Sequence, residues 1–159
     1  MKLSFGMIVS IILIIIFIAF AFFAIKKFLE IQEAVKIGKF KDNLQADVDK
    51  MWGGQQGSQE KEYFLPKKIQ YVCFVNYLSS KKGENQELYS KLKQVYYGEE
   101  NMIFYPLGSA QSLEAVELKH LNMEKITSDE NPYCIAPKNG KVQMKIQKKY
   151  EEALVEITR

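Results

Sequence analysis

The stretch that decides the fold reads MIVSIILIIIFIAFAFFAI and covers residues 7–25. Ser10 is its only polar residue, and it contains no glycine, proline or charged side chain. As an α-helix, its 19 residues would be about 28 Å long, which matches the hydrocarbon thickness of a bilayer. A single segment in lipid must satisfy its own backbone hydrogen bonds, so it must be helical. The stretch therefore predicts one transmembrane helix, with membrane lipid as its partner.

A buried core helix and a cleaved secretory signal are the two alternatives for residues 7–25. A helix without a polar face does not suit the core of a chain of 159 residues. The apolar part of a secretory signal is shorter, about 7–15 residues, and ends at a site of small residues. Here the block ends in FFAIKK, residues 22–27. We therefore expect residues 7–25 to remain as a single-pass anchor, preceded by a short leader of residues 1–6.

The residues after the anchor continue a helical pattern. Apolar side chains recur in residues 26–52 mostly at steps of three and four, at Phe28, Ile31, Val35, Ile37, Phe40, Leu44, Val48 and Met51. This period predicts an amphipathic helix that extends the anchor. Gly53 and Gly54 would end it, as glycine does at helix C-termini. The extension is expected to pack under a soluble head and, in a second interpretation, also against neighbouring copies of the chain.

Residues 63–159 predict a small antiparallel β-rich head, so the expected fold class is α+β. A polar stretch over residues 53–62, GGQQGSQEKE, indicates a linker before the head. Strands are expected over residues 69–77, 102–105 and 115–121, with a short helix over residues 87–97. Alternating residues over 142–147 and a return over 153–157 predict a C-terminal hairpin.

Cys73 and Cys134, the only cysteines, bear on the side of the membrane that the head occupies. They form either a disulfide between an early and a late strand or two separate buried thiols. We favour the disulfide, which would place the head outside the cytoplasm. The lysines give the opposite answer, because only Lys2 precedes the anchor whereas several lysines follow it: Lys26, Lys27, Lys36, Lys39 and Lys41. Our prediction is an extracytoplasmic head.

No motif in the sequence predicts a catalytic, cofactor or metal site. His120 is the only histidine, which excludes a site with two histidine ligands and favours a surface or strand-edge residue. Glycine motifs that bind phosphate are missing from the sequence. The net charge is only +3 and the lysines are scattered among acidic residues, which does not favour nucleic acid. We expect a protein that is not an enzyme and has no cofactor, metal or nucleic-acid partner.

This layout resembles that of type IV pilins and pseudopilins, including archaeal relatives. The resemblance rests on a leader that ends at Gly6, an uninterrupted hydrophobic helix, an amphipathic extension and a β-rich head with two cysteines. Its specific motif covers only residues 2–25. In this family a prepilin peptidase cuts after the glycine, and the hydrophobic helices then bundle into a filament. The resemblance implies cleavage after Gly6, Met7 as the new N-terminus, and copies of the chain as partners through the N-terminal helix.

Two functions fit these expectations. The first is a membrane-anchored surface structural protein, a pilin-like subunit that displays an extracytoplasmic β head. The alternative is a static single-span anchor whose head binds an unknown protein or ligand. Leader cleavage and filament formation would separate the two.

Overall fold

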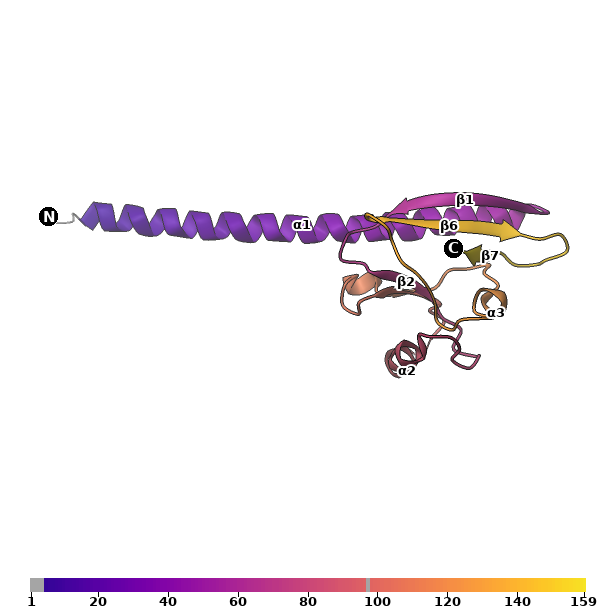
Figure 1. Ribbon diagram of the computed structural model, residues 1–159. Helices are drawn as coiled ribbons and strands as arrows, with labels where there is room; N and C mark the ends of the chain where they lie inside the picture. Colours follow the sequence, from indigo (N-terminus) through magenta and orange to yellow (C-terminus); the bar gives the residue numbers. More distant parts are fainter. Residues whose placement is uncertain (1–4, 97) are drawn as a thin grey trace. The chain divides into compact units, whose positions relative to one another are not determined.

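The computed structural model describes residues 5–96 and 98–159 and divides into two compact units, Met1–Val35 and Lys36–Arg159. Helix α1 spans Phe5–Gly53 and contributes residues to both units (Figure 1). Antiparallel strands follow it, which confirms the α+β class and the long N-terminal helix. Residues 1–4 of the expected leader lie outside the described residues, whereas Phe5 and Gly6 begin α1.

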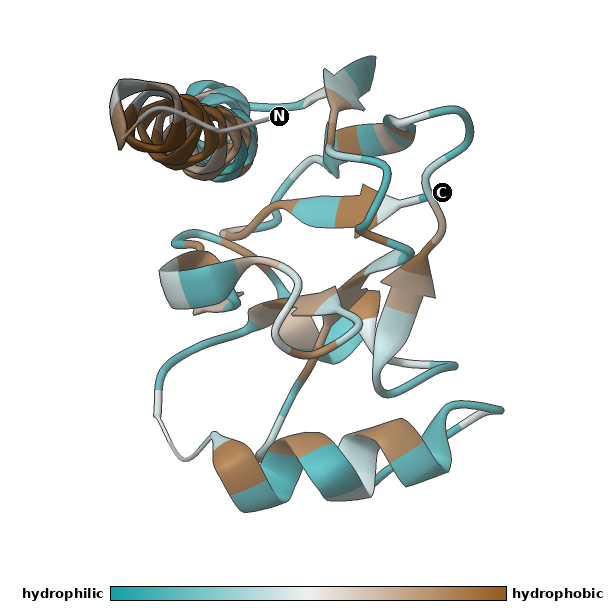
Figure 2. Cartoon of the chain, turned by 90° about the vertical axis from the view of Figure 1, so that its left-hand side faces the viewer, coloured by the Kyte–Doolittle hydropathy of each residue, from teal (hydrophilic) through white to brown (hydrophobic). Residues whose placement is uncertain are grey.

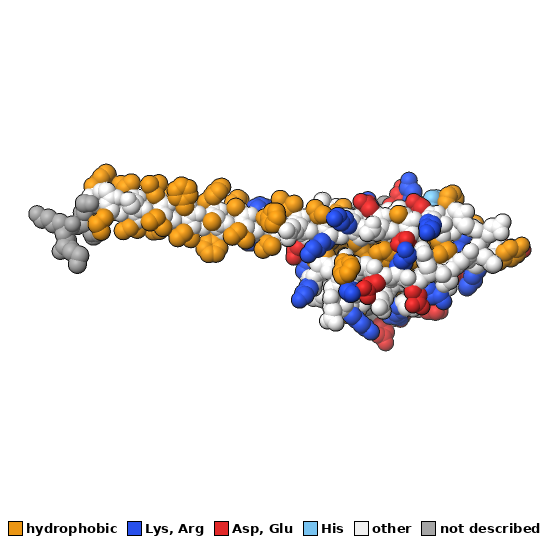
Figure 3. All heavy atoms as spheres, turned by 90° about the horizontal axis from the view of Figure 1, so that it is seen from above, with side chains coloured by type: hydrophobic (Ala, Val, Ile, Leu, Met, Phe, Trp, Pro, Cys, Tyr) orange, Lys and Arg blue, Asp and Glu red, His pale blue; other side chains and the backbone are white. Residues whose placement is uncertain are grey.

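The first unit is helical throughout its described residues. Large apolar side chains are exposed on every side of the helix, for example Ile14 at 58% and Phe17 at 69% (Figure 3). The hydroxyl of Ser10 donates a hydrogen bond to the Gly6 carbonyl at 2.9 Å, so this polar side chain is satisfied within the helix. Residues 7–25 of α1 therefore have no polar face to turn toward water, whereas Lys26, Lys27 and Gln32 after them are exposed polar residues.

The second unit contains a three-stranded antiparallel sheet in the order β1-β6-β7. These strands are β1 (Gly57–Phe64), β6 (Lys141–Lys148) and β7 (Glu156–Thr158). Strand β6 buries Val142, Met144 and Ile146 on one face, as its alternation predicts. Its pairing with β7 confirms the C-terminal hairpin.

A second antiparallel sheet has the order β4-β3-β2-β5. Its strands are β2 (Tyr71–Phe74), β3 (Met102–Tyr105), β4 (Ala115–Val116) and β5 (Tyr133–Ile135). Strand β2 ends at Phe74, earlier than expected, and beyond it the Asn76 amide donates to the side chain of Asn131 instead of to a strand. Helix α2 (Gln86–Val95) packs its hydrophobic residues near this sheet, whereas η1 (Gln111–Leu113) and α3 (Met123–Ile126) were not expected (Figure 2).

The core of the second unit forms around the end of α1. Ile37, Phe40, Leu44 and Val48 lie three or four residues apart and are at most 2% exposed. The ring of Phe40 meets Tyr63 of β1 and Phe104 of β3 edge to face, with centroids 5.4 and 5.6 Å apart. This stripe therefore joins both sheets to α1.

The expected linker over residues 53–62 is wrong from Gly57 onward. Strand β1 begins there and pairs with β6 along its whole length, Gly57 opposite Lys148 and Phe64 opposite Lys141. Its composition is polar because Tyr63 is its only buried residue. Backbone pairing does not require an apolar side chain, so composition alone concealed this strand.

Candidate membrane anchor and disulfide-linked head

Within the described residues, α1 is the one helix that is long and apolar enough to cross a membrane. None of its most apolar segment is buried. Lys26 and Lys27 follow this segment and are exposed, and Lys27 Nζ lies 3.0 Å from a carboxylate oxygen of Glu30. Long lysine side chains at the end of an apolar helix can extend toward water while their stems stay in apolar surroundings. Residues 7–25 thus have the chemistry of an anchor that binds lipid or other apolar helices.

The predicted cleavage point lies in the first turn of α1. Gly6 and Met7 both have helical backbone, and the Gly6 carbonyl accepts the Ser10 hydroxyl. Cleavage after Gly6 stays a prediction.

Cys73 and Cys134 form a disulfide, with the two sulfur atoms 2.09 Å apart. The residues lie directly opposite each other in β2 and β5 and are 61 residues apart in the sequence. Cys73 is fully buried and Cys134 is 6% exposed. The predicted pairing is confirmed, and the interpretation as two separate thiols is wrong. The bond holds β5, a strand of three residues at the edge of the sheet, on β2.

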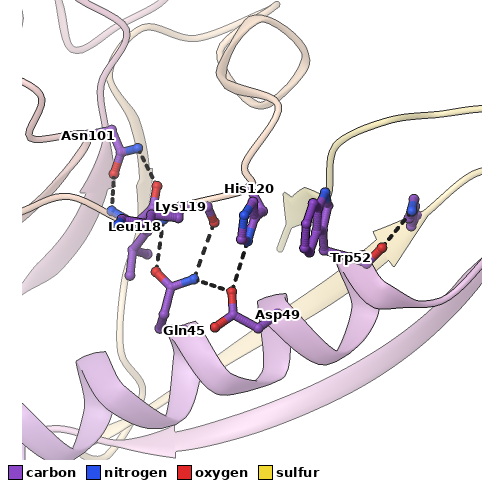
Figure 4. A network of polar contacts seen from close by, with 8 residues as sticks. Gln45, Asp49, Trp52, Asn101, Leu118, Lys119 and His120 are labelled. Atoms are coloured by element: carbon purple, nitrogen blue, oxygen red, sulfur yellow. Dashed lines mark hydrogen bonds and ion pairs between the residues drawn. The ribbon is translucent and has the colours of Figure 1, made fainter.

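Side-chain amides hold the segment between β4 and α3 against its neighbours (Figure 4). Asn101 makes two 2.8 Å hydrogen bonds with the backbone amide and carbonyl of Leu118. On the next residue, the Lys119 amide donates to Gln45 Oε1 of α1 at 2.8 Å. Gln45 Nε2 in turn donates to Asp49 at 2.7 Å. Asn101 thus holds Leu118, and Gln45 of α1 holds Lys119. These contacts fix the segment to α1.

His120 extends the same network and packs on Trp52 (Figure 4). Its Nδ1 lies 3.0 Å from Asp49 Oδ1, and its ring is stacked on the indole at a centroid distance of 3.8 Å and an angle of 4°. The hydrogen bond with His120 lowers the pKa of the Asp49 carboxyl most, and the hydrogen bond from Gln45 lowers this pKa further. His120 is partly exposed, as expected for a surface histidine. Sequence reasoning missed its partners, because Asp49 and His120 are 71 positions apart.

A buried carboxylate forms a second charged cluster. Glu156 of β7 is 6% exposed and lies 3.2 Å from Lys125 Nζ and 3.4 Å from Lys149 Nζ. Burial alone would raise the pKa of Glu156, but hydrogen bonds from Gln147 and Lys125 and the nearby positive charges lower it overall. The cluster includes Glu152, which binds Lys125. These contacts join α3 to the C-terminal hairpin.

The head also has a groove of about 870 Å³ between the segment after β2, the end of α2 and the start of α3. Aromatic, polar and apolar residues line it, among them Tyr77, Tyr96, Glu100, Asn101 and Met123. Burial, with smaller effects of neighbouring groups, raises the pKa of Tyr77. Among the described residues, no group of three or more His, Cys, Asp or Glu side chains could hold a metal. The groove lining includes the charged residues Lys93, Glu99, Glu100 and Glu124 as well as aromatic and apolar ones.

Comparisons with protein-family models, with curated proteins and with solved structures give no match to this chain. Its likeness to pilins therefore rests on its architecture, a long apolar N-terminal helix followed by an antiparallel head.

Proposed function

We propose that this protein is a single-pass membrane protein that displays its head outside the cytoplasm as a pilin-like structural subunit. The observation that carries the proposal is the division of α1. Its residues 7–25 expose apolar side chains on all sides, whereas its residues 37–48 bury an apolar stripe in the head. The first pattern suits lipid or a bundle of apolar helices, and the second suits a folded domain in water. The proposal assigns no catalytic activity, cofactor or nucleic-acid partner.

The disulfide supports an extracytoplasmic head, because such bonds persist in oxidising compartments. The lysine count favours the opposite orientation, because Lys26, Lys27, Lys36, Lys39 and Lys41 all follow residues 7–25 within about 20 residues. The proposal gives the disulfide precedence, because both of its cysteines are buried in the head.

Intact mass of the protein extracted from its native membrane, with and without reduction, tests this proposal. Loss of residues 1–6 is expected, together with filaments that sediment after shearing. A gain of two hydrogens on reduction is expected from the disulfide. A full-length mass and no sedimenting material would contradict the pilin-like assembly but would leave the membrane anchor intact.

A static anchor with a ligand-binding head is the second candidate. The groove lined by Tyr77 and Tyr96 favours it, because it offers a concave site on the head. Ile11 favours it as well, since bacterial pilins carry a glutamate at the equivalent position, five residues after the cleavage point. An uncleaved monomer whose head retains a small molecule on gel filtration would support this candidate.

A further inference from the structure

Lysines from three separate segments gather at the end of the head where the second part of α1 begins. Lys36 and Lys39 belong to α1, Lys67 follows β1, and Lys138 precedes β6. All four are exposed, and among the described residues none of the four has an ion-pair partner. Lys68 is half-buried and is not counted with them. We call these four lysines the basic end of the head.

Backbone hydrogen bonds bring the two loop segments of the basic end together. The Leu65 amide donates to the Gly140 carbonyl at 2.9 Å, just beyond the last pair of the β1–β6 ladder. Lys138 and Lys141 exchange two backbone hydrogen bonds, of 2.7 and 3.0 Å. The segments that carry Lys67 and Lys138 therefore lie side by side, at the end of β1 and the start of β6 (Figure 1).

Phe64, the last residue of β1, connects these segments to α1. It lines a cavity of about 170 Å³ together with Lys36 and Lys39. Its side chain is 66% exposed, and Lys141 Nζ lies 5.0 Å from the centre of its ring. The basic end thus presents an exposed aromatic ring among its lysines.

The acidic residues near the basic end do not cancel its charge. Glu62 lines the same cavity, but it already binds Lys141 at 2.7 Å. Asp42 likewise binds Lys41 at 3.3 Å. Glu114, which accepts a backbone hydrogen bond, adds one negative charge in the segment after η1. The four exposed lysines outnumber it, so this end of the head stays positively charged.

The lysines at the other end of α1 are mostly engaged within the head. Lys148 Nζ donates to two carbonyls at the end of α1, at 2.7 and 2.9 Å. Lys125 and Lys149 lie 3.2 and 3.4 Å from carboxylate oxygens of Glu156. Lys50 is exposed there and provides an internal control below. The free positive charge is therefore greater at the basic end.

The basic end is also the part of the head that chain length holds closest to the membrane anchor. Residues 26–35 are helical and span about 15 Å. Whatever the angle between the two units, Lys36 therefore lies within about 15 Å of the apolar block. Headgroups occupy about 5–8 Å of that distance. Residues 26–41 add five lysines against two glutamates.

We infer that the basic end of the head binds the acidic headgroups of the membrane that holds the anchor. Clusters of four or more lysines beside a transmembrane helix attract acidic lipids, and an aromatic ring such as Phe64 suits the interface. A soluble acidic protein or a nucleic acid is disfavoured, because the anchor holds this end beside lipid. The inference rests on the membrane anchor of the proposed function, but not on pilin-like assembly or on the side of the membrane.

Lysine labelling of the full chain in lipid nanodiscs tests the inference. One disc contains phosphatidylcholine alone, and the other contains about one third phosphatidylglycerol. An amine reagent should label Lys39 and Lys138 about threefold more slowly in the acidic disc, whereas Lys50 should react equally in both. In 1 M salt the difference should disappear, because the Debye length falls to about 3 Å. Equal labelling of Lys39 and Lys138 in both discs would overturn the inference, as would equal slowing of Lys50.

Two pairs of substitutions show whether the head itself makes the contact. Lys67→Glu with Lys138→Glu reverses the charge of the two loops and should abolish most of the protection of Lys39 in the acidic disc. Lys81→Glu with Lys93→Glu changes the net charge equally at exposed positions elsewhere on the head and should leave that protection intact. The same result from both pairs would overturn the inference.

Two further controls separate the possible failures. Lys67→Gln with Lys138→Gln removes the charges without reversing them, so it remains informative if the glutamate pair misfolds. It should abolish about half of the protection of Lys39. A chain that stays in both discs but shows no dependence on acidic lipid would overturn this inference alone. A chain that leaves both discs would contradict the membrane anchor, and the inference with it.

Discussion

Two parts of the same helix differ in where they place their apolar residues. In residues 7–25 the apolar side chains lie on all sides and are exposed, as Ile14 is at 58%. In residues 36–53 they form one stripe, and Leu44 in that stripe is fully buried. The comparison shows that helix formation and burial are separate requirements. One part is adapted to an apolar surrounding and the other to a protein core next to water.

The largest effect expected is confined to the head. Replacing Cys73 and Cys134 together by alanine should lower the free energy of unfolding of the head by about 4 kcal/mol, because a loop of about sixty residues is no longer closed. Membrane retention should not change. Urea unfolding followed by Trp52 fluorescence in micelles measures the first quantity, and carbonate extraction measures the second. Equal stability before and after reduction of the native protein would contradict this prediction.

A matched pair of alanine substitutions tests the division of α1 directly. Leu44→Ala should cost about 3–4 kcal/mol of head stability, because it leaves a cavity among buried residues. Ile14→Ala should change head stability by less than about 0.5 kcal/mol, because Ile14 lies outside that core. The same urea titration reports both. Similar losses from the two variants would show that residues 7–25 are part of the folded head.

A lysine substitution should also distinguish the two parts of α1, here by its effect on membrane insertion instead of on head stability. Ile15→Lys places an ammonium group in the middle of the anchor and should cost about 3 kcal/mol of membrane insertion. Asn43→Lys, at an exposed position of the second part, should have no effect on insertion. The fraction that resists carbonate extraction is the measurement. An Ile15→Lys protein that stays fully embedded would argue against the membrane assignment.

The smallest effect concerns the contact between the end of α1 and residues 119–120. Because the pKa of Asp49 is lowered in the folded protein, its ionised form contributes stability above the ordinary pKa of 3.8. That contribution is lost as the pH falls through the lowered value. Asp49→Asn should therefore cost less than about 1 kcal/mol near neutral pH and nothing in strong acid, since the group is half exposed.

Stability of wild type and Asp49→Asn across pH tests this, with Asp42→Asn as the control, since Asp42 is an exposed acid of the same helix that pairs with Lys41. A difference from wild type that persists in strong acid would show that the aspartate contributes through packing instead of charge.

Much of the architecture could be predicted from patterns of neighbouring residues in the sequence. The hydropathy of residues 7–25, the steps of three and four that end at Val48, and the alternation in β6 each depend on near neighbours in the sequence. Strand β1 was missed because its side chains are polar and its partner β6 lies over seventy residues away. The contacts of His120 were missed for the same reason.

The sequence by itself determined that α1 is a long helix with an apolar half, because backbone geometry and hydropathy act within one segment. It also indicated the disulfide, because two cysteines in one small domain allow a single pairing. Only the tertiary structure decided that Phe28 and Val35 stay exposed while Ile37 and Phe40 are buried, because burial depends on what packs against a residue. It alone revealed that β1 pairs with β6, because the two strands lie more than seventy residues apart in the sequence.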